Sequence, residues 1–398
     1  MNPLHLWLTL LLVAVQSPAP ADTIPGYLRF GFALLRQRLE VTPNENISIS
    51  PVSAGFALSA AALGARSRTQ EQMLNVLGFE GSTPDDAGRV NQAWIAALRN
   101  PPEVELEIAN AVWVDREFAL DSGYAHRTAQ VFQAEVTSAA LRTPDGVADV
   151  NAWVARHTHD RIEKILDAPR LNTAAFIANA IYFKGKWLKE FAKNATRPKP
   201  FYSSPGSAHN VPTMHAKLSA GYAETGRVAL ARLPYRGGRF EMVIVLPDSG
   251  VEAVSVARDL KESVWQSWLA QTRSTELELA LPRFKLETAM SLKPDLEAMG
   301  MTDAFDPRLA DLSAMFASGT PSTFLSEVLQ KTWLVVDEEG TEAAAVTGIT
   351  MDATSALVRR PPIPFVVNRP FIYALRDTKT GLVLFLGLVR DPSAASHS

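Results

Sequence analysis

The chain has 398 residues, 47% of them hydrophobic and 20% charged, which are the proportions of an ordinary soluble globular protein. Its formal net charge of -3 gives no electrostatic reason to expect a nucleic acid or an anionic membrane as partner. The absence of cysteine excludes disulfides, thiolate metal sites and cysteine nucleophiles.

The N-terminus has the features of a secretory signal peptide. An apolar run at positions 4–15 is too short to cross a bilayer, and the small residues APA follow at positions 19–21. We predict that residues 1–21 are removed and that the mature chain is secreted, to an extracellular or periplasmic location, without membrane association. The alternative is an ordinary N-terminal helix, since the N-terminal end of the segment has His5 but no lysine or arginine.

The remaining chain shows no low-complexity linker and no internal repeat, which predicts one domain over residues 22–392 and a short tail at 393–398. His157 and His159 are the only close pair of histidines. Because no acidic residue stands at metalloprotease spacing, we interpret them as surface residues of a helix and predict no metal site and no cofactor. No motif of a serine hydrolase, zinc peptidase or phosphate-binding loop occurs, so no enzymatic activity is expected.

Apolar periodicity predicts helices mainly in the first half of the chain and strands mainly in the second, an α+β pattern. The predicted helices cover residues 27–39, 51–63 (with Ser50 as cap), 68–77, 122–132, 147–166 and 292–299. The predicted strands cover residues 108–114, 176–183, 229–233, 240–246, 276–281, 371–376 and 382–389, the last two joined by a hairpin turn.

The predicted strand at 176–183 is apolar throughout except for Asn179, as in a strand buried on both faces. A buried carboxamide without partners costs about 1–3 kcal/mol, so Asn179 requires hydrogen-bonding neighbours. Ser50, Ser53 and Gln330 are the candidates. Asn179 could be a satisfied polar group of the core or a latch that holds strands together reversibly.

Residues 337–364 can be interpreted either as an exposed loop or as a strand. Alternate positions carry no charge, whereas Glu342 and Asp352 fall on the opposite parity, which is typical of a strand with one buried face. The uncharged parity consists of Thr341, Ala343, Ala345, Thr347, Ile349, Met351 and Ala353. Three prolines at 361, 362 and 364 end the segment and allow it to remain a loop.

A series of motifs along the whole mature chain resembles the serpin family. In order they are NISISPVS (46–53), NAVWV (110–114), ADVNAWV (148–154), NAIYFKGKW (179–187), LPY (233–235), MVIVLP (242–247), LPRF (281–284), ADLS (310–313), EEGTEAAA (338–345) and NRPFIYAL (368–375). The resemblance implies three β-sheets, about nine helices and an exposed reactive-centre loop over about residues 338–364.

In this family the loop is attacked as a substrate, an acyl-enzyme forms, and the cleaved loop enters the large sheet as a new strand. The resemblance therefore implies a serine peptidase, or a cysteine peptidase, as covalent partner, and we expect a monomer. The alternative is a non-inhibitory serpin that serves as a carrier or chaperone.

The resemblance also assigns regions to individual residues. The hinge of the loop is Glu338, Glu339, Gly340, Thr341, Glu342, Ala343, Ala344 and Ala345. The shutter, beneath the point where the sheet opens, is Ser53, Asn179 and Gln330, with glutamine where the family usually has histidine. The breach, where the loop enters, is Lys184, Trp187 and Arg283, with Arg283 and Glu338 expected to form an exposed ion pair worth only about 0–1 kcal/mol.

The family's spacing from Gly340 places the bait bond between Thr354 and Ser355, which predicts an elastase-like or other peptidase with a small specificity pocket. Met351-Asp352 and Ala356-Leu357 are alternatives because the loop is long. Arg359-Arg360 would suit a trypsin-like peptidase, but it lies far beyond the family's position.

Overall fold

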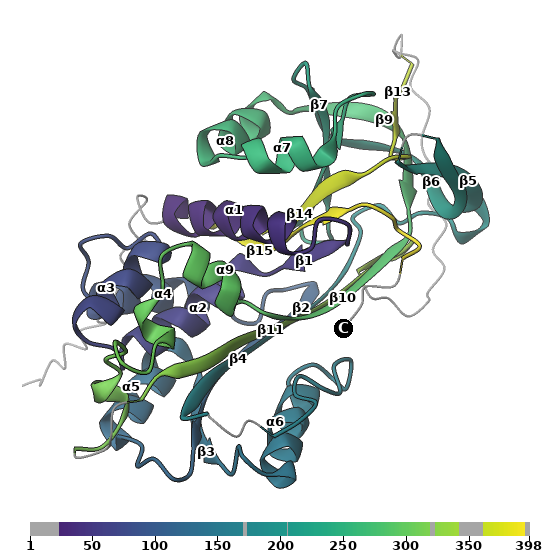
Figure 1. Cartoon of the computed structure of the whole chain (residues 1–398). Coiled ribbons are helices and arrows are strands. Elements are labelled where there is room, and N and C mark those ends of the chain that lie inside the picture. Colours follow the sequence, from purple (N-terminus) through teal and green to yellow (C-terminus); the bar gives the residue numbers. More distant parts are fainter. Residues whose placement is uncertain (1–23, 170–172, 205, 319–322, 342–360, 395–398) are drawn as a thin grey trace, which may run out of the picture.

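The computed structural model describes residues 24–169, 173–204, 206–318, 323–341 and 361–394 (Figure 1). The predicted signal peptide, the hinge from Glu342 onward and all four candidate bait bonds lie outside these ranges. No helix among the described residues is long and apolar enough to cross a membrane.

Nine α-helices occur within the described ranges. They are α1 (Ile24–Val41), α2 (Pro51–Ala62), α3 (Ser67–Val76), α4 (Pro84–Leu98), α5 (Ser122–Phe132), α6 (Pro144–Arg156), α7 (Ala253–Asp259), α8 (Glu262–Gln271) and α9 (Lys293–Ala298).

The smaller of two sheets has six strands in the order β10-β11-β12-β4-β2-β3. Their bounds are β2 (Val104–Asp115), β3 (Glu135–Ala139), β4 (Ala175–Lys186), β10 (Phe284–Ser291), β11 (Leu325–Val336) and β12 (Gly340–Thr341). β4 and β11 run parallel and pair with each other directly below the two-residue strand β12.

The larger sheet has nine strands in the order β1-β15-β14-β8-β7-β6-β9-β13, with β5 paired to β6. Their bounds are β1 (Ile47–Ile49), β5 (Arg197–Ser204), β6 (Ser207–Glu224), β7 (Val228–Pro234), β8 (Phe240–Pro247), β9 (Arg273–Pro282), β13 (Ile363–Val366), β14 (Phe371–Asp377) and β15 (Val383–Val389). The family resemblance implied three sheets, whereas the hydrogen-bonded strands of the described residues form two. The reason is β6, whose 18 residues pair with β9 over most of their length and with β7 at the end, so that one strand joins two groups.

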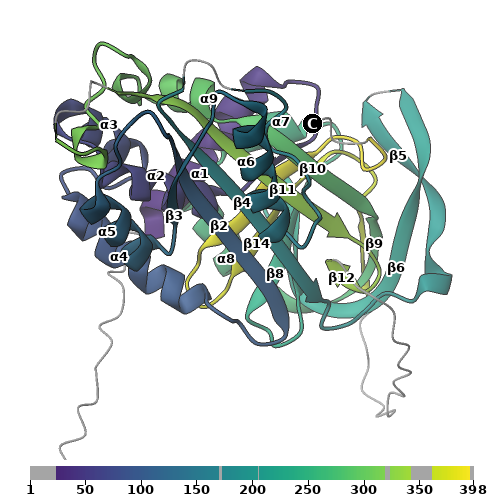
Figure 2. The same cartoon turned by 90° about the horizontal axis from the view of Figure 1, so that it is seen from below.

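The six-stranded sheet lies between two apolar layers, with α6 against one face and the main core, which includes α1 and α2, against the other (Figures 1 and 2). Successive residues of β4 serve the two layers alternately: Ile177 and Ile181 join the main core, while Ala178 and Tyr182 join the cluster under α6. Burial on both faces explains why this strand is apolar without interruption except at its centre.

Every predicted helix and strand is present, with ends that differ by a few residues, except that the helix predicted at 147–166 ends at Arg156. His159 and Asp160 have φ angles of 49° and 57°, which an α-helix cannot contain, and the Thr158 hydroxyl donates to the Val154 carbonyl at 2.8 Å. The prediction that His157 and His159 lie on a helix is therefore wrong.

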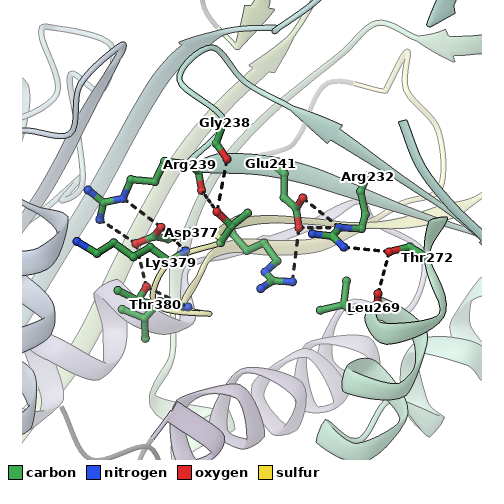
Figure 3. Close-up of polar contacts among 12 residues, drawn as sticks. Arg232, Gly238, Arg239, Glu241, Leu269, Thr272, Asp377, Lys379 and Thr380 are labelled. Atoms are coloured by element: carbon green, nitrogen blue, oxygen red, sulfur yellow. Dashed lines mark hydrogen bonds and ion pairs between the residues drawn. The ribbon is translucent and has the colours of Figure 1, made fainter. Parts of the chain in front are cut away.

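A buried ion pair fixes the hairpin between β14 and β15 (Figure 3). Arg239 donates to both carboxylate oxygens of Asp377, at 3.1 and 2.8 Å, and the Asp377 side chain has no exposure to solvent. The same carboxylate accepts hydrogen bonds from the Lys379 amide at 3.0 Å and from the Thr380 hydroxyl at 2.9 Å. One aspartate thus neutralises a guanidinium and shapes the turn.

We predict that Asp377→Ala lowers the free energy of unfolding by about 3–5 kcal/mol, because it leaves the largely buried Arg239 guanidinium without its carboxylate. Urea denaturation measures the loss, and the double variant Arg239→Ala/Asp377→Ala should recover part of it. Asp259→Ala is the matched control, since Asp259 and Arg227 form an exposed pair at 3.2 Å that contributes only about 0–1 kcal/mol. Equal losses of unfolding free energy for Asp377→Ala and Asp259→Ala would contradict the conclusion that the Arg239–Asp377 pair stabilises the fold more than an exposed pair does.

Candidate functional site

The site is built around the seam between β4 and β11, the two parallel strands at the centre of the six-stranded sheet. Their pairing runs from Leu325 opposite Ala175 to Trp333 opposite Tyr182. Beyond Trp333 the strands separate, and β12 occupies the space between them. β4 and β11 therefore pair directly along most of the seam, and β12 lies between them at one end (Figure 2).

β12 runs antiparallel to both of its neighbours. Gly340 lies opposite Lys186, and Thr341 lies opposite Gly185 on β4 and Val336 on β11. Gly340 has a φ of 152°, and a Cβ at this position would lie 2.0 Å from the Gly185 carbonyl oxygen. Only glycine fits this close approach to β4.

Thr341 is fully buried against an aromatic cluster. Its hydroxyl lies 2.7 Å from the phenol oxygen of Tyr235. The Tyr235 ring stacks on Trp187 with centroids 4.5 Å apart and meets the edge of Phe183 at 5.1 Å. Burial raises the pKa of the Tyr235 phenol, so it remains a neutral hydrogen-bonding group.

Hydrogen bonds from side chains and from the backbone hold the turn that precedes β12. The Trp187 indole donates to the Asp337 carbonyl at 2.9 Å, and the Phe191 amide donates to the Glu338 carbonyl at 2.7 Å. The Asp337 carboxylate accepts from the Glu339 and Gly340 amides at 2.9 and 3.2 Å. The polypeptide is thus fixed up to the residue at which it enters the sheet.

Two ion pairs neutralise the glutamates of this turn. Arg283 donates to Glu338 at 2.7 Å, and Lys193 pairs with Glu339. The prediction of an exposed Arg283–Glu338 pair is wrong for the glutamate, because the Glu338 side chain is only 1% exposed. Although burial raises the pKa of Glu338, hydrogen bonds from Arg283 and Thr196 outweigh it and hold the pKa below its usual value.

A row of amide side chains crosses the sheet at the middle of the seam. Asn179 faces Asn110 on β2 and Gln330 on β11 in strand register. Gln330 donates to the Asn179 side-chain oxygen at 2.8 Å, Asn179 donates to the Ser53 hydroxyl, and the amides of Asn179 and Asn110 lie 2.6 Å apart.

Gln330 also bonds the backbone of Ser50, accepting from its amide at 2.9 Å and donating to its carbonyl at 3.0 Å. The Ser50 hydroxyl caps α2 by accepting from the Ser53 amide at 3.3 Å. These buried partners satisfy the Asn179 amide, and they connect the seam to the start of α2.

The structure thus brings together the three residues predicted for the shutter and places Trp187 and Arg283 beside the hinge. Lys184 lies apart from them, paired with Glu105 at 3.0 Å. Tyr235, Lys193 and Asn110 were not predicted from the sequence, although Tyr235 and Asn110 lie within the serpin-like motifs LPY and NAVWV. Their role depends on pairing between strands distant in the chain, which no local pattern reveals.

No group of three or more histidine, aspartate or glutamate side chains suited to a metal ion occurs in the described part of the chain. A segment that continues from Thr341 along its present direction would enter the seam between β4 and β11.

Comparison with known proteins identifies the family. A family model described as "Serpin (serine protease inhibitor)" matches residues 26–392. Iripin-8 of Ixodes ricinus is 36% identical over 368 residues, covering 90% of each chain. The leukocyte elastase inhibitor of Bos taurus is 34% identical over 376 residues, covering 92% of this chain and 98% of the relative.

A solved structure agrees with this match. The native-state crystal structure of tengpin, a thermophilic serpin, superposes with a TM-score of 0.87 at 29% identity, covering 94% of this chain and 95% of tengpin. The chain belongs to the serpin family of serine protease inhibitors.

Proposed function

We propose that this serpin is a secreted suicide inhibitor of elastase-like or other small-pocket serine peptidases. The observation that supports the proposal most directly is β12, in which the first residues of the reactive-centre loop already lie between β4 and β11. The relationship to a leukocyte elastase inhibitor and the small residues Thr354 and Ser355 at the proposed bait bond support the choice of peptidase.

The register of β12 predicts where each loop residue would lie after insertion. Because Thr341 is opposite Gly185 and Val336, each further residue would move one position down both neighbouring strands. Thr347 would then lie opposite both Asn179 and Gln330, and Met351 would lie opposite Ala175, where β4 begins. Cleavage at Thr354-Ser355 would therefore release a segment long enough to span the whole seam.

This register also gives the shutter a role in insertion. The hydrogen bond between Gln330 and Asn179 must break for a strand to pass between them. The Thr347 hydroxyl would arrive at the same level and could bond both amides, so the polar groups would not remain unsatisfied. About a dozen new ladder hydrogen bonds at ~0.5–1.5 kcal/mol each, with side-chain burial, would release on the order of 10 kcal/mol.

The central test is incubation with elastase-, chymotrypsin-, subtilisin- and trypsin-like peptidases, followed by denaturing electrophoresis and mass spectrometry. We expect a band at the summed mass of the two proteins with an elastase-like peptidase, together with a released peptide of residues 355–398. Cleavage without such a band for every peptidase would contradict inhibition, and a different peptide mass would name a different bait bond.

A new charge should prevent inhibition at one set of alternate loop positions and be tolerated at the other. We predict that Thr347→Arg converts the protein from an inhibitor into a substrate, because the guanidinium would have to be buried between Asn179 and Gln330. The matched control is Glu342→Arg, because the parent chain already carries a charge at this position, which the same register places opposite the part-exposed Lys184. The number of inhibitor molecules consumed per peptidase should rise at least about tenfold for the first variant only. Equal effects of the two variants would contradict insertion in this register.

Gln330→His should make the stability of the intact protein depend on pH. Ser53, Asn110 and Asn179 around this position are uncharged, so burial should hold the pKa of the new imidazole below about 6.5, its value in the unfolded chain. Below that pH the unfolded state would bind a proton that the folded state does not. Relative to the parent, stability should therefore fall by up to about 1.4 kcal/mol per pH unit as the pH decreases from 6.5.

Urea denaturation between pH 7.5 and 5.5 measures this difference. Gln330→Leu is the control, since it removes the same hydrogen bonds without adding a titratable group. If the free energy of unfolding of Gln330→His varied with pH in the same way as that of the parent protein, the assignment of this position as a buried site among uncharged groups would be contradicted.

A further inference from the structure

A cavity of about 440 Å³ lies on the face of the six-stranded sheet that α6 covers (Figure 2). Residues 161–167, which lie between α6 and β4 in the chain, form one wall, and Glu287, Ala289 and Lys331 form the sheet side. The neighbouring Gln330 side chain bonds Ser50 on the opposite face. The cavity is therefore separate from the row of amide side chains at the seam.

Small neighbours on both sides make room for a cavity at Lys331. The lysine has the same parity on β11 as Leu329 and Trp333, which belong to the apolar cluster under α6. Its partners in strand register are Ala289 on β10 and Ala180 on β4. Because both partners are short, the long lysine side chain lies over the sheet with space beside it.

The amine of Lys331 is buried and poorly supplied with acceptors. Lys331 is only 5% exposed, and its Nζ donates to the Lys164 carbonyl at 2.6 Å. Among the described residues its ion-pair partner is Glu287, whose Oε1 lies 3.9 Å away, too far for a hydrogen bond. An ammonium has three hydrogens to satisfy, whereas a neutral amine has two and a lone pair. This site therefore favours the neutral amine more than water does.

The charged side chains around the amine are of both signs. They are Arg161, Glu163, Lys164, Asp167 and Glu287. The first four are exposed, so water and salt screen their charges. Burial is the largest effect on Lys331 and lowers the pKa of its amine, although the three carboxylates oppose the change. At neutral pH a larger fraction of this amine is thus unprotonated than of an exposed lysine.

An unprotonated lysine in a desolvated cavity is a nucleophile towards carbonyl compounds. We propose that Lys331 is a reactive lysine that condenses with a small aldehyde entering this cavity. Nζ attacks the aldehyde carbon and forms the C–N bond of a carbinolamine. The carbonyl oxygen then leaves as water with the two amine hydrogens, and an imine remains.

The surroundings of Lys331 favour an aldehyde over a reagent that leaves a charge. Condensation with carbon dioxide would give a carbamate, which would place a second negative charge beside Glu287. An imine adds no negative charge, and the apolar part of the aldehyde can pack against Ile165 and Ala289. The imine nitrogen has no hydrogen when neutral, so condensation also ends the contact with the Lys164 carbonyl.

The test uses salicylaldehyde as the probe, at less than one equivalent and pH 7. Sodium borohydride reduces the imines to stable amines, and peptide mass spectrometry measures the label at each lysine. Lys261, an exposed lysine beside α8, is the internal reference. Lys331→Arg removes the nucleophile but keeps a donor for the Lys164 carbonyl. Lys164→Arg is the matched control, because it removes only an exposed amine at the rim of the cavity.

We expect Lys331 of the folded parent to acquire at least about tenfold more label than Lys261, and the two to react equally in urea. Lys331→Arg should lose the fastest phase of imine formation, and Lys164→Arg should retain it. Label on Lys331 no greater than on Lys261, or a fast phase that survives in Lys331→Arg, would overturn the proposal. If Lys331→Arg does not fold, the peptide map of the parent decides alone. None of these outcomes depends on whether the protein inhibits a peptidase.

Discussion

The structure depends on the seam between β4 and β11, which is closed here and which the proposed mechanism requires to open. β4 and β11 pair directly over most of their length, between two apolar layers, yet the centre of the seam consists of amide groups rather than aliphatic side chains. Hydrogen bonds between amides are satisfied in the closed sheet and can be satisfied again by another polar group. An aliphatic centre would offer an inserted threonine no partner.

β12 marks the end of the seam at which the proposed insertion would begin. Gly340 passes within contact distance of the β4 backbone, and Thr341 is held by Tyr235. Buried glutamates paired with Arg283 and Lys193 fix the preceding turn, so the direction and register of the chain are set before cleavage. The intact state would then be a kinetic trap in which only the loop's far attachment prevents completion of the strand.

Local sequence patterns predicted helices and strands well where the pattern of burial or capping is clear. The apolar run of β4 and the capped start of α2 are correct, because two-sided burial and capping leave clear signatures. The end of α6 was not predicted: histidine and aspartate adopt left-handed backbone more often than most residues, but both also occur within helices, so His159 and Asp160 alone do not mark an end. Two partners of Asn179, Ser53 and Gln330, were anticipated from chemistry. Asn110 and the Thr341–Tyr235 contact were not, because they depend on strand register that sequence periodicity does not contain.

The most direct test of strand insertion compares the denaturation of the intact protein with that of protein cleaved once within the loop by a peptidase that it does not trap. Insertion predicts that the cleaved form, with both fragments still associated, gains on the order of 10 kcal/mol and unfolds at a much higher temperature. Equal unfolding temperatures for the intact and cleaved forms would contradict the account.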